Sequence, residues 1–259
     1  MAEVFFLGTG GALPTGERDN TAFLLRDNGL CALIDCPGSV VQKIVRAGVR
    51  PLDVASLFVT HVHPDHIYGL PSLVHGLMLR EHVIRLFGSA ESVDFCGRLL
   101  DLFGLWQSQY RTRVEFIELA PGRPVRLAGG AEVTGHRVPH HASSLAYEFR
   151  LEGGRLKLVF SGDAPVYPPL FERAEDADAL FHDCGAPARF FAQYPALAAK
   201  HTSALDLGTW SGRVRVKTLV PCHFLGELDF AAAEAEAEIR AGFSGRLVMP
   251  ADLGGCVIS

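Results

Sequence analysis

The chain has 259 residues, a length that fits one large domain or at most two small ones. Hydrophobic residues make up 48% of it and charged residues 20%, so a sizeable core can be buried and a disordered or fibrous protein is excluded. The 24 Lys and Arg residues face 29 Asp and Glu residues, and the resulting net charge of −5 provides no overall basic footprint for nucleic acid.

The cysteines and the first residues bear on the cellular compartment. The six Cys residues are scattered without a CxxC pair, which favours reduced thiols over a disulfide framework. The N-terminal residues show no basic region followed by a long apolar run, and no run of about 18 apolar residues follows elsewhere. We therefore expect a cytoplasmic protein with no membrane partner.

Short apolar runs bounded by turn residues predict β-strands along most of the chain. A Gly-Gly pair at 153–154 predicts a hairpin between two of these strands. In chain order the predicted strands span residues 4–8, 21–25, 31–36, 56–60, 83–88, 114–119, 132–138, 144–151, 155–161, 179–182, 218–222 and 246–250.

Helical spacing of apolar residues appears between the strands, at 39–47, 89–103 and 230–241. The second of these helices has Ser89 as a candidate N-cap, with an acidic residue in its first turn. Strands mixed with a few helices predict an α/β architecture with sheets inside and helices outside. No linker or charge block divides the sequence, so we expect a single domain over 1–259.

A dense group of His and Asp residues follows the predicted strand at 56–60. Residues 61–66 read HVHPDH, so three imidazoles and one carboxylate can point into one cleft at the C-terminal end of that strand. Neutral imidazole and carboxylate are ligands that zinc prefers in proteins. A His-rich surface turn is the alternative, but the motif follows a buried strand and leads into a Gly-Leu-Pro segment. The pattern predicts a metal site that includes His61, His63, Asp65 and His66.

Several further motifs accompany this one. The sequence reads FLGTGGALP at 6–14, LIDC at 33–36 and IYGLP at 67–71. With HxHxDH, they resemble the metallo-β-lactamase-fold hydrolases, and within these the ribonuclease Z and arylsulfatase branch. The resemblance implies an αββα sandwich of two mixed β-sheets flanked by helices, with a dinuclear metal site at one edge.

The resemblance also implies the remaining metal ligands. His140 stands seven residues before a Tyr in a predicted strand; His141 is the alternative in register, and His136 is a more distant one. Asp163 ends an SGD segment, and His223 ends the strand at 218–222. The implied ligand set places His61, His63 and His140 on one metal, Asp65, His66 and His223 on the other, and Asp163 on both.

Two residues outside this set match segments of the same branch. His201 lies in KHTSA at 200–204, and Asp183 ends DADALFHD at 176–183, where the family has Glu. By analogy, His201 would stabilise developing charge or protonate the leaving oxygen, oriented by Asp183. A helix cap near Thr202 is the alternative role for His201. Asp65 would position the attacking water together with the metals, and Asp35 and Thr60 would orient ligand imidazoles, although a turn is an equal explanation for Asp35.

The implied activity is that of a dinuclear zinc hydrolase. We expect a phosphodiesterase that acts on phosphodiester or related ester bonds through a hydroxide bridging two Zn²⁺ ions; iron or manganese would also suit these ligands. A lactonase, an arylsulfatase and a β-lactamase-type hydrolase are alternatives on the same site. From a different class, a non-catalytic metal-binding regulator is a further alternative.

Other features concern the substrate and the partners. Only Glu152-Gly153-Gly154 separates two predicted strands, where tRNA-processing members carry a long basic arm, so we expect a small or short substrate rather than tRNA. Dimers are common among such relatives, and a homodimer is one expected state. The run at 106–113 mixes aromatic and cationic residues and is a candidate for the mouth of the substrate site, although a loop packed over the core is the commoner explanation.

Overall fold

The computed structural model describes residues 1–105 and 110–259, so part of the aromatic and basic run at 106–113 lies outside the described residues. The described strands form two sheets. In each sheet, part of the strands are parallel and part are antiparallel, so both sheets are mixed.

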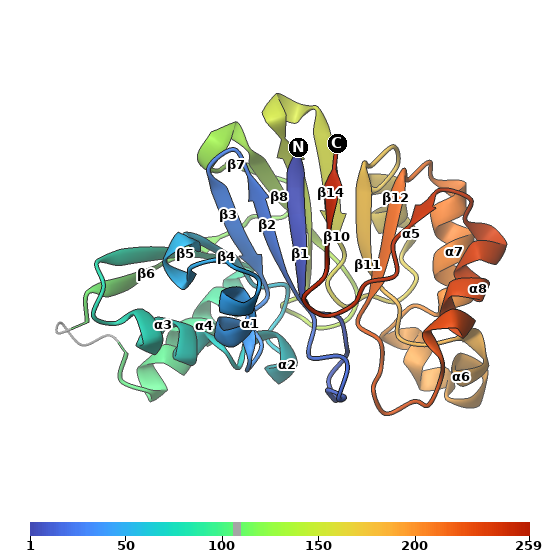
Figure 1. Cartoon of the computed structure of the whole chain (residues 1–259), viewed down its shortest axis with the longest axis horizontal. Coiled ribbons are helices and arrows are strands. Elements are labelled where there is room, and N and C mark those ends of the chain that lie inside the picture. Colours follow the sequence, from blue (N-terminus) through green and yellow to red (C-terminus); the bar gives the residue numbers. More distant parts are fainter. Residues whose placement is uncertain (106–109) are drawn as a thin grey trace.

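The first sheet begins with antiparallel strands and continues with parallel ones. The two ends of the chain meet in it, since the first and last strands pair (Figure 1). In spatial order its strands are β14 (Gly255–Ile258), β1 (Ala2–Gly8), β2 (Ala22–Asp27), β3 (Leu30–Ile34), β4 (Ser56–Phe58), β5 (His82–Gly88) and β6 (Thr112–Glu118).

The second sheet has the same mixture of directions. The predicted hairpin is present in it as an antiparallel pair joined by a short turn at Glu152–Gly154. In spatial order its strands are β13 (Arg246–Leu247), β12 (Thr218–Cys222), β11 (Ala179–Asp183), β10 (Leu156–Phe160), β9 (Leu145–Leu151), β8 (Glu132–Arg137) and β7 (Pro124–Arg126).

Aromatic side chains fill the space between the sheets. Phe58 of β4 lies 5.0 Å from Phe149 of β9, and Phe23 of β2 lies 5.4 Å from Phe160 of β10, measured between ring centroids. Burying each such side chain stabilises the fold by roughly 1.5–3 kcal/mol. One apolar cluster therefore joins residues of both sheets.

Helices cover the outer face of each sheet, four on either side in the described part of the chain (Figure 1). Apolar residues of these helices pack on the outward side chains of the strands, such as Ile44 on the first sheet and Ile239 on the second. The first group is α1 (Val40–Arg46), α2 (Pro64–Ile67), α3 (Leu70–Leu77) and α4 (Ala90–Leu102). The second is α5 (Pro168–Arg173), α6 (Ala188–Gln193), α7 (Ala204–Arg213) and α8 (Ala232–Gly242).

These layers confirm the predicted αββα sandwich of two mixed sheets. The expectation of one domain over 1–259 stays a prediction. Each predicted strand is present, but the one at 246–250 is shorter than expected, and β7 and β14 were not predicted. Both of these are edge strands of three or four residues, too short to show alternation. No helix in the described ranges is long and apolar enough to cross a membrane.

Candidate metal centre and active site

The His-rich motif occupies the connection from β4 to α2. Pro64 takes the first position of α2, where a missing N–H costs nothing, and His63 before it is extended. His61 and His66 are buried, whereas His63 is half-buried. The short connection therefore presents its imidazoles at the edge of the sandwich.

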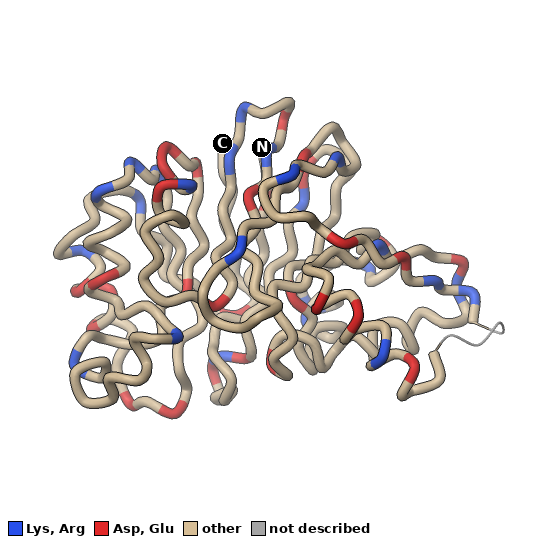
Figure 2. Tube along the Cα trace, turned by 180° about the vertical axis from the view of Figure 1, so that it is seen from behind, with Lys and Arg blue, Asp and Glu red and all other residues tan. Residues whose placement is uncertain are grey.

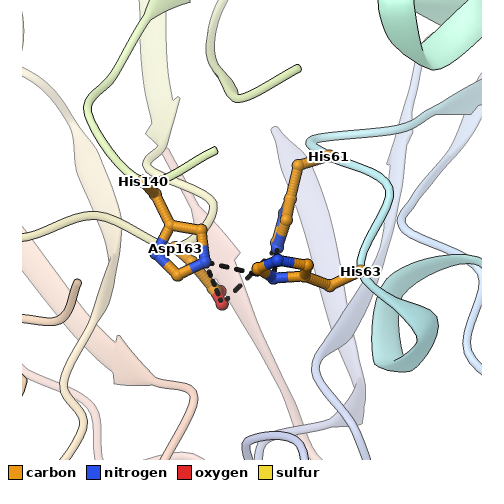
Figure 3. A group of neighbouring side chains, drawn as sticks. All are labelled: His61, His63, His140 and Asp163. Carbon is orange, nitrogen blue, oxygen red and sulfur yellow. Dashed lines mark hydrogen bonds and ion pairs between the residues drawn. The ribbon is translucent and has the colours of Figure 1, made fainter. Parts of the chain in front are cut away.

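One group of candidate ligands lies on both sides of that edge. His61 and His63 come from the β4–α2 connection, His140 follows β8, and Asp163 follows β10 (Figure 3). His63 Nδ1 lies 2.9 Å from His61 Nε2 and 3.2 Å from His140 Nε2. Asp163 Oδ2 lies 3.7 Å and 3.6 Å from the same two Nε2 atoms. The four ligand atoms lie within 4.8 Å of one another, a spacing that one cation can bridge.

A second group consists of Asp65, His66 and His223, whose ligand atoms also lie within 4.8 Å of one another. Asp65 Oδ2 is 3.4 Å from His66 Nε2 and 3.5 Å from His223 Nε2. Asp163 faces this group too, with Oδ1 3.4 Å from His66 Nε2 and Oδ2 3.1 Å from His223 Nε2. The Asp163 carboxylate therefore stands between the two groups.

Unpartnered nitrogen atoms test whether a metal fits here. His66 Nε2 and both ring nitrogens of His223 are buried without a hydrogen-bond partner among the described residues. Burying such atoms unpaired costs free energy, and a cation would satisfy the Nε2 atoms that face the carboxylates. Five imidazoles and two carboxylates suit zinc, iron or manganese. The residues present thus fit a metal-binding site.

The far nitrogen atoms of several imidazoles are held by acceptors. Asp35, with a left-handed φ of 61°, accepts hydrogen bonds from Thr60 N, Thr60 Oγ1 and His66 Nδ1, each at 2.8 Å. His140 Nδ1 is 2.8 Å from the carbonyl oxygen of Lys200, and His61 Nδ1 is 3.1 Å from Thr60 Oγ1. These contacts turn each Nε2 toward the ligand group, as is usual for metal-binding histidines.

The alternatives to His140 lie outside the ligand group. His141 is exposed, and its Nδ1 is 2.8 Å from Ser143 Oγ. His136 lies on β8 with Nε2 3.6 Å from Glu148 Oε2. The structure therefore brings His140, and neither of the alternatives, into the group.

The electrostatics of the site favour ionised carboxylates. Burial alone would raise the pKa of Asp163, but the imidazoles of His223, His66 and His61 outweigh this and hold that pKa well below its usual value. Burial likewise opposes ionisation of Asp65, and its close contacts with the imidazoles of His223 and His66 outweigh it, so the pKa of Asp65 is also lowered. Both side chains are thus negative and able to bind a cation.

His201 and Asp183 form a pair at the edge of the metal ligands. His201 Nδ1 lies 2.9 Å from Oδ2 of the fully buried Asp183, and the same oxygen accepts a hydrogen bond from the backbone N–H of Ala164 at 3.0 Å. Burial lowers the pKa of His201, but Asp183 outweighs it and raises that pKa to about 9. The His201 ring lies 5.3 Å from that of His140 and 5.2 Å from that of His223, measured between centroids. The pair is therefore adjacent to the candidate ligands.

The alternative role for His201, capping the helix that begins near Thr202, is filled by another residue. Ser203 is the N-cap of α7 and accepts a hydrogen bond from Asp206 N at 3.1 Å. His201 also lies with Asp163 and His223 in a set whose ligand atoms are within 4.8 Å of one another. Its position thus suits contact with substrate or with a metal, not capping.

Two positions that support the candidate ligands were not predicted from the sequence. The Lys200 contact with His140 uses a backbone carbonyl, which carries no residue-type signal. Gly162 has a φ of +59°, and a Cβ added there would lie 2.9 Å from Thr60 Cβ. The SGD motif was the one available signal for Gly162.

Comparisons with known proteins agree with this arrangement. The sequence profile described as "Anti-Pycsar protein Apyc1" matches residues 2–224. Ribonuclease Z from Methanosarcina acetivorans is 27% identical over 86% of this chain and 87% of its own length, whereas matches to several other ribonuclease Z sequences span about half of those proteins.

Solved structures share the fold. The metallo-β-lactamase-fold protein YhfI from Bacillus subtilis has a TM-score of 0.82 at 18% identity, and 98% of each chain is covered. The short form of human tRNase Z has a TM-score of 0.77 at 22% identity, and 99% of each chain is covered. The predicted metallo-β-lactamase fold and ribonuclease Z-like hydrolase class are confirmed by these relatives. By the match over residues 2–224, the chain belongs to the Anti-Pycsar protein Apyc1 family.

Proposed function

We propose that this chain is a dinuclear zinc phosphodiesterase. The observation that carries the proposal is the position of Asp163, whose two carboxylate oxygens face both groups of candidate ligands. Relatives named ribonuclease Z and tRNase Z add support, because those names denote enzymes that act on RNA, a phosphodiester polymer.

Each residue has a role in this proposal. His61, His63 and His140 would hold one ion, Asp65, His66 and His223 the other, and Asp163 both. Two such ions supply charge stabilisation for a phosphoryl group and lower the pKa of a water molecule. Asp65 would also accept a hydrogen bond from the attacking water.

His201 would donate a proton to the leaving oxygen. Its Nδ1 faces Asp183, so its Nε2 remains for the substrate. The Asp183 carboxylate fixes the orientation of the ring, and its Oδ2 is in turn held by the Ala164 N–H. Asp183 stands where the family has Glu, and its shorter side chain still contacts His201 directly, at 2.9 Å.

The substrate is proposed to be small or short. The turn at Glu152–Gly154 joins β9 to β10 directly, without an inserted arm. Basic and acidic residues are interspersed along the chain trace in Figure 2, which also favours a substrate smaller than a folded nucleic acid.

A substrate panel with metal analysis tests the activity. Zinc-loaded protein is assayed with bis(p-nitrophenyl) phosphate, an aryl sulfate, a lactone and nitrocefin, and its metal content is measured by mass spectrometry. We expect hydrolysis of the phosphodiester with about two zinc ions per chain. Turnover of only the lactone, sulfate or nitrocefin would assign a different hydrolase, and a fully loaded but inactive protein would favour a metal-binding regulator.

His201→Ala tests the proposed proton donor. We expect it to keep its metal while kcat falls by about 10²–10⁴-fold for substrates with poor leaving groups. The loss should be much smaller for p-nitrophenolate, which needs little protonation, and Asp183→Asn should show a weaker form of the same pattern. His75→Ala, at an exposed position of α3, is the matched control. Loss of metal from His201→Ala would make His201 a ligand, and equal slowing of both substrates would contradict proton donation.

A further inference from the structure

A cavity of about 400 Å³ lies beside the candidate metal centre, between the loop at 15–18 and the segment that follows β12. Phe224 and Leu225 line it directly after the ligand His223. A Cβ added to Gly185 would lie 3.2 Å from Leu225 Cδ1 and 3.3 Å from His201 Cβ, so Leu225 and His201 flank the same glycine. The cavity is therefore connected to the base of the His201 side chain through Leu225 and Gly185.

Arg18 lines this cavity in a fixed orientation. Its guanidinium carbon is 4.6 Å from the centroid of the Phe224 ring. Its Nη1 donates hydrogen bonds to Thr9 Oγ1 at 2.6 Å and to the Pro250 carbonyl at 2.9 Å, and Thr9 Oγ1 in turn donates to Asp252 at 2.8 Å. Nε and Nη2 have no hydrogen-bond partner in the part of the chain that the structure describes. The guanidinium plane is thus held over an aromatic ring while it borders the cavity.

The charged residues around the cavity disfavour binding of the phosphate there. Glu17, Glu227 and Asp229 line it together with the single cation Arg18. Three carboxylates against one cation disfavour an anion, so the phosphate belongs at the metal ligands, and an uncharged part of the substrate would enter here.

We propose that this cavity binds a planar aromatic or heteroaromatic group of the phosphodiester, stacked on Arg18. Guanidinium planes stack on aromatic rings and on bases, and the rigid Phe224 beneath reduces the cost of ordering the arginine. The inference rests on the proposed phosphodiesterase function and makes Arg18 a specificity residue of that reaction.

Three esters with one non-aromatic leaving group, 2,2,2-trifluoroethanol followed by fluorine NMR, test the proposal: methyl, phenyl and thymidine 5′ trifluoroethyl phosphates, of which the methyl ester has no planar group. We expect the wild-type protein to have a higher kcat/KM for the phenyl and thymidine esters than for the methyl ester. Arg18→Ala should reduce this preference by about tenfold, a typical size for the loss of one stacking contact. Arg18→Lys keeps the charge without the plane and should reduce it as well.

Arg213→Ala is the matched control, because Arg213 also stacks on an aromatic ring, Trp210 at 4.6 Å, but lies on α7 away from the cavity. It should leave the preference unchanged. Stacking would be overturned if kcat/KM fell equally for all three esters in a folded Arg18 variant. It would also be overturned if Arg18→Lys kept the full wild-type preference for the phenyl and thymidine esters. Turnover without any aromatic preference in the wild type would overturn this inference alone, whereas no turnover of any ester would overturn the proposed function with it.

Discussion

Asp35→Asn should weaken metal binding by changing the tautomer of one ligand. Asp35 Oδ1 accepts a hydrogen bond from Thr60 N, and Oδ2 accepts from Thr60 Oγ1 and from His66 Nδ1. In Asp35→Asn, the one side-chain oxygen must accept the hydrogen bond from the Thr60 N–H. The side-chain NH₂ group therefore takes the place of Oδ2 and faces His66 Nδ1. The imidazole must then accept at Nδ1 and carry its proton on Nε2, the atom that lies 3.4 Å from Asp163. A protonated Nε2 cannot bind a cation.

The size of the effect follows from the role of such supporting residues. Their loss typically costs 10–100-fold in metal affinity, equivalent to about 1.4–2.7 kcal/mol. The measurement is a zinc titration against a competing chelator, accompanied by thermal unfolding of the metal-free protein. Because the amide still fills the same space and keeps partners, the metal-free protein should lose only roughly 1 kcal/mol of stability.

Asp178→Asn is the control for the loss of a buried carboxylate. Asp178 is 6% exposed, accepts a hydrogen bond from Lys157 N at 2.8 Å and lies 2.7 Å from Lys217 Nζ. It belongs to neither group of candidate ligands, so zinc affinity should stay at the wild-type value. Wild-type zinc affinity in Asp35→Asn, or an equal loss in Asp178→Asn, would refute the tautomer argument.

Two further substitutions test the position of the shared carboxylate. Asp163→Ala removes the one side chain that faces both ligand groups, so bound zinc should fall below two ions per chain and activity should fall by orders of magnitude; both ions retained at full rate would contradict the assignment. At Gly162 the φ is +59°, and an added Cβ would lie 2.9 Å from Thr60 Cβ. Gly162→Ala should therefore lower the free energy of unfolding by about 1–3 kcal/mol or more and should weaken zinc binding. Gly122→Ala has a φ of +75° in open space, so it measures the backbone strain alone, and equal losses in the two glycine variants would remove the Thr60 contact from the explanation.

Much of the fold and of the candidate site could be predicted from the sequence because both depend on strands. A buried strand shows as an apolar run, and candidate ligands such as His61, Asp163 and His223 lie just after one. Local patterns therefore placed these residues at strand ends, and the family resemblance connected ends that are distant along the chain. Asp35 follows the same rule, since it comes directly after β3.

The parts that could not be predicted depend on the folded backbone. The Lys200 carbonyl holds His140, but any residue type could supply it. The cavity beside Arg18 requires the loop at 15–18 to meet the segment after β12, a contact that no local pattern indicates. Short elements such as α2, with four residues, also lack enough length to show a helical period.

The candidate metal centre is divided between the two halves of the sandwich, and this division explains how its geometry is maintained. His61 and His66 follow strands of the first sheet, whereas Asp163 and His223 follow strands of the second. Next to them, the Leu145 N–H of the second sheet donates a hydrogen bond to the carbonyl of Thr60, which follows β4 of the first sheet, at 2.9 Å. The separation of the two sets of ligands is therefore determined by packing between the sheets, which places the site on rigid elements. A cation bound to both sets would in turn link the sheets, and at 100 times its Kd it would stabilise the folded state by about 2.7 kcal/mol.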